Sequence, residues 1–458
     1  MALRTIFNIS ITCGILLAPK LIMIFMLSVL TTMAIEIHGL SIKLIPITSL
    51  FPKNFTLEER HHKLFEISRN RAYQHVQRQQ QHSMIMSNST SALTSTNSIS
   101  KFANAVTPPL SVRYHPPNGF YMTQVSIGSK LYSPYLLIDS GTDMSWVQCE
   151  GCTSCFSVTG TGNYKYSESQ SYRKLPCNHP LCVSKTCTGD GLYCIYNHVY
   201  LSSSGSGVVS TETFTFRTES RFRSTAKYPD LVFGCAFDNR NIPFAEDPGN
   251  VIAGVFGLDL GRQSMLVQLQ AQTKLRFSYC LSWSDRSTVL QFGDEASASM
   301  RHQKSGLQTT TLERGGLDQY YVAILSISIP MAQNKSRCVQ TNSATLDFRG
   351  ALVEYIAQRY SGLRPMQRGI REFDLCYNLT TPGIRYVFPS MTFHFKQADF
   401  VMRLEAVFQS FGTVRCLAML AMHEANEPTI LGAFQQTNYR FLFDGDQSLM
   451  SFVPENCA

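Results

Sequence analysis

The stretch that decides the fold is YLLIDSGTDMSWVQC, residues 135–149. An apolar run rich in strand-forming residues, Tyr135 to Ile138, delivers Asp139 into a short polar turn. A carboxylate at the end of such a strand lies close to the low-dielectric interior, where ionisation is costly unless hydrogen-bond donors point at it. Asp139 is therefore a candidate catalytic carboxylate.

The turn after Asp139 contains Ser140, Gly141 and Thr142, and Trp146, one of only two tryptophans, follows a few residues later. Gly141 permits a tight turn, and the two hydroxyls can hydrogen-bond the carboxylate. An Asp-Ser-Gly tripeptide alone is ordinary turn chemistry. The interpretation therefore depends on the strand, the tryptophan and the cysteines that surround it.

Beyond Pro116 the chain consists of short runs rich in Val, Ile, Tyr, Phe and Thr, separated by Gly, Pro, Asn and Ser. The runs are Phe120–Ile127, Tyr135–Ile138, Thr211–Phe216, Leu231–Phe233, Tyr320–Ile329, Met391–Phe395 and Tyr439–Phe443. Helical patterns are scarce, the main candidates being Met265–Gln272 and Gly350–Tyr360. A mostly antiparallel β protein is expected.

The apolar strand, the D-S/T-G-S/T turn and the tryptophan at this offset resemble the first active-site loop of pepsin-like aspartic proteases. The cysteine spacing that follows resembles the plant nepenthesin-type branch, and the resemblance extends from about Asn118 to Cys457. It implies a mostly β, bilobed fold with a cleft between two antiparallel β lobes. The implied lobes are residues 116–300, with a cysteine-rich insertion at about 149–194 and a flap, and residues 301–458.

The same resemblance implies that Cys194–Phe216 forms the flap that closes over substrate, with Tyr200 as the flap tyrosine bonded to Trp146. The glycines that the family has directly after this tyrosine are replaced by residues 201–203 (Leu, Ser, Ser), so Gly205 and Gly207 are the candidates for the bend.

Aspartic proteases need a second carboxylate that shares a proton with the first. In the corresponding segment, residues 337–360, an alignment of NSAT with the family's DSGT puts Asn342 where the second catalytic Asp belongs. The alternative is Asp347, the only acidic residue between Arg337 and Arg349, which requires a deletion before the following helix. An incomplete gene model around residues 340–350 would look the same. Both readings leave the second motif degenerate, and we name Asp347 as the candidate partner of Asp139.

Fourteen cysteines indicate an oxidising compartment. Cysteines at 149, 152 and 155 alone could suggest zinc, but the later ones have no paired histidines at finger spacing, so a disulfide-stapled insertion is expected and no metal. The family's frame implies the pairs Cys149–Cys152, Cys155–Cys235, Cys177–Cys194, Cys182–Cys187, Cys280–Cys457 and Cys376–Cys416, with Cys338 left over.

The chain has 40 Lys and Arg against 32 Asp and Glu. Residues 1–115 hold 11 of the basic and 4 of the acidic side chains, which leaves 29 against 28 for the rest. The folded body therefore lacks the basic patch of a nucleic-acid-binding protein. It also lacks H-E-x-x-H, P-loop and dinucleotide-binding motifs, so no cofactor is expected.

The N-terminus combines Lys20 with an apolar run, Leu21–Ile35, and the small residue Gly39. This pattern predicts a signal peptide over residues 1–39, in preference to a membrane anchor. Residues 40–115 follow, with a basic amphipathic helix at Thr56–Gln80 and a Ser/Thr/Asn-rich linker, and we interpret them as a pro-segment over an acidic cleft. Glycosylation sequons lie at Asn54, Asn88, Asn334 and Asn378.

The resemblance implies a secreted aspartic endopeptidase that acts on polypeptides at acidic pH through a carboxylate-activated water. The expected location is extracellular or apoplastic, with vacuole or plastid as alternatives, and we expect a monomer with no nucleic-acid partner and no stable membrane anchor. The alternative function is a catalytically inactive, protease-like binding or inhibitor protein of the cell wall. The degenerate second motif favours that alternative, whereas the intact residues around Asp139 favour the enzyme.

Overall fold

The computed structural model describes residues 41–46, 110–113, 121–199, 204–217, 225–242, 249–282, 287–301, 305–313, 318–330, 336–340, 348–369, 373, 375–380, 384–419 and 430–457. Several predictions fall outside these residues: the leader at 1–39, the helix at Thr56–Gln80, Tyr200, Asn342, Asp347, and the sequons at Asn54, Asn88 and Asn334. In the part of the chain that is described, no helix is long and apolar enough to cross a membrane.

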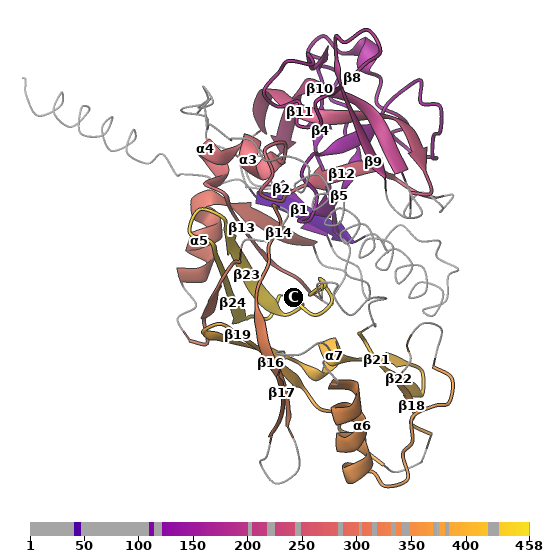
Figure 1. Ribbon diagram of the computed structural model, residues 1–458, viewed down its shortest axis with the longest axis vertical. Helices are drawn as coiled ribbons and strands as arrows, with labels where there is room; N and C mark the ends of the chain where they lie inside the picture. Colours follow the sequence, from indigo (N-terminus) through magenta and orange to yellow (C-terminus); the bar gives the residue numbers. More distant parts are fainter. Residues whose placement is uncertain are drawn as a thin grey trace, which may run out of the picture. The chain divides into compact units, whose positions relative to one another are not determined.

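Strands dominate the described residues, as predicted (Figure 1). In the first half they are β1 (Ser41–Pro46), β2 (Leu110–Arg113), β3 (Tyr121–Gln124), β4 (Ser126–Ile127), β5 (Tyr135–Asp139), β6 (Trp146–Gln148), β7 (Arg173–Lys174), β8 (Thr186–Cys187), β9 (Cys194–Val199), β10 (Ser204–Arg217), β11 (Thr225–Arg240), β12 (Ile252–Gly257), β13 (Arg276–Cys280) and β14 (Ser287–Phe292). In the second half they are β15 (Gln308–Thr311), β16 (Ile324–Pro330), β17 (Ser336–Gln340), β18 (Cys376–Asn378), β19 (Met391–Phe395), β20 (Ala398–Met402), β21 (Phe408–Phe411), β22 (Val414–Leu417), β23 (Tyr439–Asp444) and β24 (Leu449–Pro454).

The helices are short. They are α3 (Met265–Gln268), α4 (Gln270–Thr273), α5 (Gly293–Arg301), α6 (Phe348–Arg359) and α7 (Leu404–Val407), with a 3₁₀ turn η2 at Tyr166–Glu168. The predicted helices at 265–272 and 350–360 are confirmed as α3 with α4 and as α6. The sequence gives no periodic signal for α5, which begins with Asp294 and Glu295 in its first turn and ends at Arg301, charges that complement the helix dipole.

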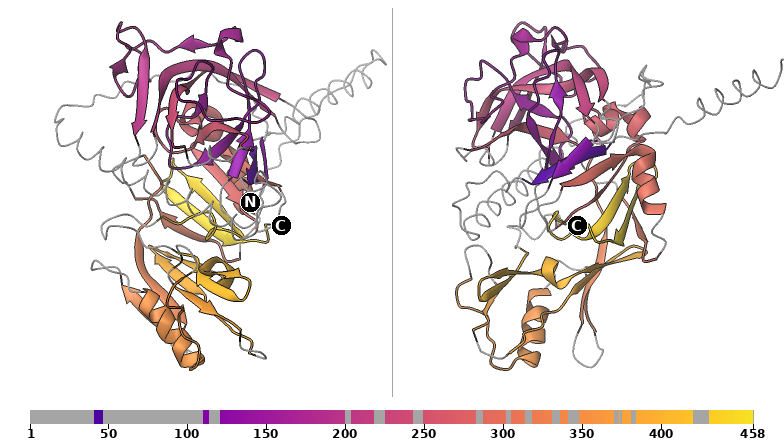
Figure 2. Two further views of the ribbon diagram at one scale, coloured as in Figure 1. Left: turned by 90° about the vertical axis from the view of Figure 1, so that its right-hand side faces the viewer. Right: turned by 180° about the vertical axis from the view of Figure 1, so that it is seen from behind.

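One large sheet joins strands from both halves of the sequence. β13 pairs with β14 on one side and with β23 on the other, and β24 then connects β23 to β15. Two smaller sheets consist of second-half strands alone, in the orders β17–β16–β19–β20 and β18–β22–β21 (Figures 1 and 2). The predicted mostly antiparallel β architecture is confirmed.

Strands β1 and β2 pair with the same partners. Residues Thr288 to Leu290 of β14 are opposite Ile42–Leu44 of β1 and also opposite Leu110–Val112 of β2. Met122 of β3 is likewise opposite both Ile45 and Arg113. The other edge of β3 is taken by β5. β1 and β2 also pair with each other in parallel, with Lys43 and Leu44 opposite Val112, so the two strands are neighbours that both contact β14 and β3.

The core is built from aromatic side chains that alternate along the strands. Fully buried rings in the first half include Phe214, Phe216, Phe233 and Phe256, and those in the second half include Phe400, Phe441 and Phe452. Along β19 the side chains of Met391, Phe393 and Phe395 are buried, while those between them are partly exposed. This period of two leaves one polar face on the sheet of β16, β19 and β20.

Candidate active site

Asp139 is the last residue of strand β5, which pairs along its length with strand β12. The two strands run parallel, with Phe256 opposite Ile138 and Gly257 opposite Asp139, and every residue of β12 is buried. The backbone N–H of Leu258 donates to the carbonyl oxygen of Asp139 at 2.9 Å. The apolar run that predicted a buried strand therefore forms β5, and its pairing with β12 fixes the position of Asp139 at the end of the strand.

The carboxylate of Asp139 is held by its own turn. Asp139 is 7% exposed. The Gly141 N–H donates to Oδ1 at 3.0 Å, and the Thr142 hydroxyl donates to Oδ2 at 2.7 Å. Donors to both oxygens stabilise the charged form of a carboxylate in a buried place. The Ser140 side chain, in contrast, is exposed.

Trp146 begins β6, which runs between two other strands. It lies opposite Gly234 of β11 and Val255 of β12, and it is 8% exposed. A Cβ added to Gly254 would lie only 1.9 Å from the Trp146 carbonyl oxygen. The Ser145 hydroxyl accepts the Gly257 N–H at 2.9 Å. The loop between β5 and β6 is therefore packed directly on β12.

A segment just before β16 also contacts the loop. The Gln319 side-chain amide donates to the Gly141 carbonyl at 3.0 Å, and the Tyr321 hydroxyl donates to Gln319 Oε1 at 3.1 Å. The Tyr320 hydroxyl donates to the Leu258 carbonyl at 2.8 Å, and burial raises its pKa well above its ordinary value. Sequence reasoning predicted a strand over Tyr320–Ile329, whereas β16 begins at Ile324. It missed these contacts, because a glutamine before an apolar run carries no specific signal.

Two further carboxylates brace the chain after β12. Asp143 Oδ1 accepts the Gln263 N–H at 2.8 Å, and Asp259 Oδ1 accepts the Gly261 N–H at 2.8 Å. Asp259 is buried, and it contributes to the raised pKa of Tyr321 after the larger effect of that ring's own burial. Sequence reasoning did not single out either carboxylate. Both shape the turn that leads into α3.

The residues predicted to complete the site lie in segments that the structure does not describe. Tyr200 lies between β9 and β10, whose ends pair as a hairpin with Val199 opposite Ser204. Asn342 and Asp347 lie between β17 and α6. Cys338, the cysteine left over by the predicted frame, is on β17 opposite Ser328.

Two of the disulfide pairings that the family resemblance implied for the first lobe are wrong. The pairs are Cys149–Cys235 and Cys152–Cys155, in place of the expected Cys149–Cys152 and Cys155–Cys235. The parallel pairing of β6 with β11 is the reason, because the Cys149 N–H bonds the Ala236 carbonyl at 3.0 Å. The Cα atoms of Cys149 and Cys235 are thus 5.5 Å apart, within disulfide range.

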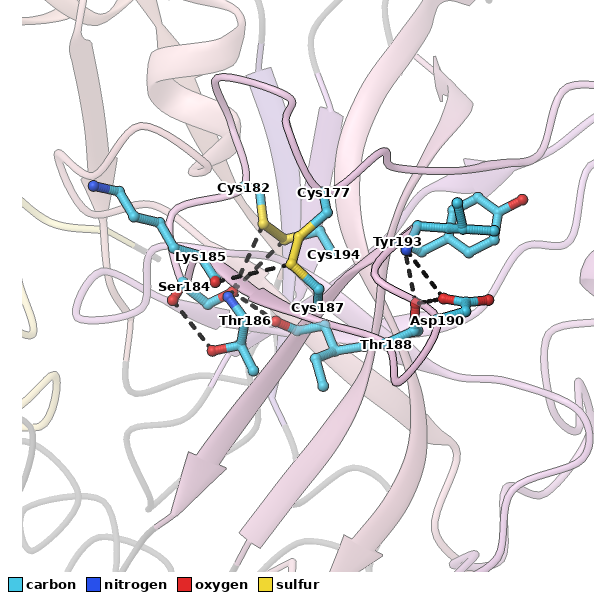
Figure 3. The surroundings of a disulfide bond; sticks show 12 residues. Cys177, Cys182, Ser184, Lys185, Thr186, Cys187, Thr188, Asp190, Tyr193 and Cys194 are labelled. Carbon is cyan, nitrogen blue, oxygen red and sulfur yellow. Dashed lines mark hydrogen bonds between the residues drawn. A yellow bond between two sulfur atoms is a disulfide. The ribbon is translucent and has the colours of Figure 1, made fainter.

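Two more implied pairings are wrong in the cysteine-rich insertion. The pairs are Cys177–Cys187 and Cys182–Cys194, in place of Cys177–Cys194 and Cys182–Cys187. Figure 3 shows these four cysteines gathered in one small cluster beside Ser184 and Thr186. Cys187 and Cys194 are opposite each other on β8 and β9, so spacing along the chain could not select the partners. Cys280–Cys457 and Cys376–Cys416 are the pairs that the resemblance implied.

Comparison with known proteins gives consistent matches along the body of the chain. The family profiles described as Xylanase inhibitor N-terminal and Xylanase inhibitor C-terminal match residues 121–294 and 346–454, together more than half of the chain. Aspartic proteinase nepenthesin-1 of Nepenthes gracilis is 28% identical over 369 residues, which cover 74% of this chain and 79% of that protein. Nepenthesin-2 of the same species is 28% identical over 368 residues, covering 74% and 78%.

Among solved structures, conglutin gamma, a basic 7S globulin from lupine seeds, superposes with a TM-score of 0.57 at 18% identity. The match covers 73% of this chain and 91% of that one. At this identity the likeness concerns the fold alone.

Proposed function

Because the chain belongs to the plant family of pepsin-like aspartic proteases, we propose that it is an aspartic-type endopeptidase that cleaves polypeptides at acidic pH. The observation that carries the proposal is the Asp139 carboxylate, which is buried and held by the Gly141 N–H and the Thr142 hydroxyl. The relatives named as aspartic proteinases support the same class of reaction.

The chemistry requires two carboxylates that share one proton. The ionised one takes a proton from a water molecule, which attacks the peptide carbonyl carbon, and the protonated one donates to the carbonyl oxygen. We assign one role to Asp139 and the other to Asp347. The held geometry of Asp139 suits the proton acceptor, because both of its oxygens already receive hydrogen bonds that favour the charge.

Residues 40–115 act in this proposal as a pro-segment of a secreted zymogen, after a signal peptide at 1–39. Their positive charge complements an ionised cleft, and acid weakens that attraction by protonating carboxylates. Both strands of this segment, β1 and β2, pair with β14 and β3 of the body, which supports a segment that lies against the body before its removal. The lobes at 116–300 and 301–458 and a monomeric state belong to the same proposal.

A second candidate is a protease-like protein that binds partners without cleaving them. The family profiles that match are described as xylanase inhibitor domains, and the chain has NSAT at residues 342–345 where the protease motif reads DSGT. A single carboxylate cannot both accept and donate the proton. If Asp347 does not reach Asp139, this second function is the one that the fold retains.

The deciding experiment is digestion of a denatured protein by the purified full-length chain after acidification to about pH 3–5, with and without pepstatin. The matched variant is Asp139→Asn, which keeps the shape of the turn. We expect cleavage that pepstatin and the substitution both abolish. No cleavage by a folded, disulfide-complete sample would favour the binding protein, and cleavage that survives Asp139→Asn would contradict both readings of the site.

A further inference from the structure

In the sheet β17–β16–β19–β20, three adjacent strands bring a serine, a histidine and an aspartate into one line of hydrogen bonds. Ser328 Oγ lies 2.8 Å from His394 Nε2, and His394 Nδ1 lies 2.7 Å from Asp399 Oδ1. The three residues belong to β16, β19 and β20, which are adjacent in the sheet. Figure 1 shows β16 and β19 side by side.

The sheet register explains why these side chains meet. His394 is directly opposite Asp399 on β20 and Ser326 on β16, so Ser328 is its diagonal neighbour on the same face. Diagonal neighbours on one face of an antiparallel pair are within reach of a long side chain. The intervening residues Phe393 and Phe400 point to the buried face. The line of polar groups therefore lies on the outer face, with the His394 side chain 29% and the Asp399 side chain 60% exposed.

The order of the atoms assigns a role to each group. A carboxylate only accepts hydrogen bonds, so the Nδ1 that faces Asp399 carries the proton. Nε2 is then an acceptor, and the Ser328 hydroxyl donates to it. An oriented base with its free lone pair on a serine hydroxyl is the arrangement that activates serine as a nucleophile.

We propose that Ser328, His394 and Asp399 form a second reactive site, a nucleophilic serine that is acylated by small activated esters. The Ser328 oxygen attacks the ester carbonyl carbon while its proton moves to His394 Nε2. The C–O bond to the alcohol then breaks, and the alcohol leaves with that proton. Water, deprotonated by His394, attacks the acyl carbon, which releases the acid and restores the hydroxyl.

The surroundings of the site select the substrate class. The flanking backbone N–H groups take part in the ladders of β16–β19 and β19–β20, so few donors remain for a developing oxyanion. Esters with good leaving groups depend least on that stabilisation. Among the described residues, the His394 and Asp399 side chains are 29% and 60% exposed on the outer face of the sheet, which suits a small substrate. Small aryl esters and organophosphorus esters are therefore the compounds that this site takes, and peptides are not.

The test uses the full-length protein and a fluorophosphonate probe at about pH 8, where imidazole is neutral. We expect one adduct, mapped by mass spectrometry to Ser328, and matching turnover of p-nitrophenyl acetate. Ser328→Ala abolishes the adduct, and His394→Gln slows labelling by about 10²-fold or more. Asp399→Asn slows it by about tenfold, because this carboxylate is exposed and its pairing is screened by water. Ser326→Ala, on the same face, is the matched control and leaves labelling unchanged.

Two readouts separate this site from the proposed protease. Pepstatin and Asp139→Asn both abolish peptide cleavage, and neither affects the labelling of Ser328. Labelling of Ser328 no faster than that of Ser326, or a rate that His394→Gln leaves unchanged in a folded variant, would overturn the proposal. If a variant fails to fold, the position of the adduct in the unmodified protein decides the matter: an adduct at a residue other than Ser328 refutes the proposal.

Discussion

The loop that carries Asp139 and its counterpart in the second half receive different support. The first begins at the end of β5, ends at Trp146 on β6, and lies against the fully buried β12. In the counterpart, β17 ends at Gln340 and a helix, α6, begins at Phe348, with Leu352 and Ile356 buried. The first loop keeps the family motif, whereas residues 342–345 read NSAT. The half that keeps the family motif is the one whose loop lies where β5, β6 and β12 meet.

The sharpest way to test this comparison is to remove one carboxylate from each half. Asp139→Asn and Asp347→Asn should each reduce kcat for peptide cleavage at acidic pH by about 10³-fold or more, roughly 4 kcal/mol of transition-state stabilisation. Residues that act as one unit are not additive, so the double variant should be no worse than either single one. The measurement is steady-state cleavage of a peptide by the acid-treated chain.

Asn342→Asp is the control for that prediction. If Asp347 is the working partner, a new carboxylate at position 342 changes kcat by less than about tenfold. A large gain from Asn342→Asp, with no loss from Asp347→Asn, would show that the alignment through NSAT is the correct one. The motifs of the two halves would then differ at two positions, Asn342 in place of Asp and Ala344 in place of Gly.

A stability measurement probes the packing behind the first loop. Gly254→Ala places a Cβ 1.9 Å from the Trp146 carbonyl oxygen and 2.8 Å from the Val147 Cα, both on β6. Because backbone atoms in a sheet cannot give way, we expect the free energy of unfolding to fall by about 3 kcal/mol or more. Urea titration measures it. Gly189→Ala, with open space around the added Cβ, should change it by less than about 0.5 kcal/mol.

The turn itself is tested by removing one hydroxyl. Thr142→Val keeps the shape of the side chain but deletes the donor to Asp139 Oδ2. A hydrogen bond to a charged group contributes about 2 kcal/mol, so kcat should fall by about 30-fold. Thr153→Val removes a hydroxyl that bonds the Phe237 carbonyl on the surface of the insertion, and activity should not change. Equal losses in both variants would mean that the Thr142 effect is not specific to the carboxylate.

The sequence could predict contacts between residues that are close along the chain, but not contacts between residues that are far apart in it. The strand–turn around Asp139 was predictable, because its donors come from the next three residues. The Gln319 contact to Gly141 joins residues far apart in the chain and has no local pattern. The partners of Cys177, Cys182, Cys187 and Cys194 depend on how β8 and β9 pair, and Ser328 meets His394 only through a sheet register. The spacing of residues along the chain predicts none of these contacts.

The smallest expected effect concerns the anchor of β5. The Tyr132 hydroxyl donates to the Gly162 carbonyl at 2.6 Å, and burial raises the pKa of Tyr132 to about 12. Tyr132→Phe should lower the free energy of unfolding by about 1 kcal/mol at neutral pH. In the second half, the Tyr360 hydroxyl donates to the Arg385 carbonyl at 3.3 Å and accepts the Val387 N–H at 2.5 Å. Both hydrogen bonds are exposed, where water can replace the lost partner, so Tyr360→Phe should cost less.

The pH dependence of the free energy of unfolding tests the contribution of the Tyr132 hydroxyl specifically. The unfolded chain releases the tyrosine proton near pH 10, whereas folded Tyr132 retains it up to about pH 12. Its contribution is therefore fully present below about pH 10 and is lost as the pH rises toward 12. The stability gap between the unmodified protein and Tyr132→Phe should narrow between about pH 10 and about pH 12, as followed by urea unfolding at each pH. A gap that stays constant would mean that Tyr132 is not protected from titration by the fold, and that the β5 anchor is looser than its hydrogen bond to Gly162 implies.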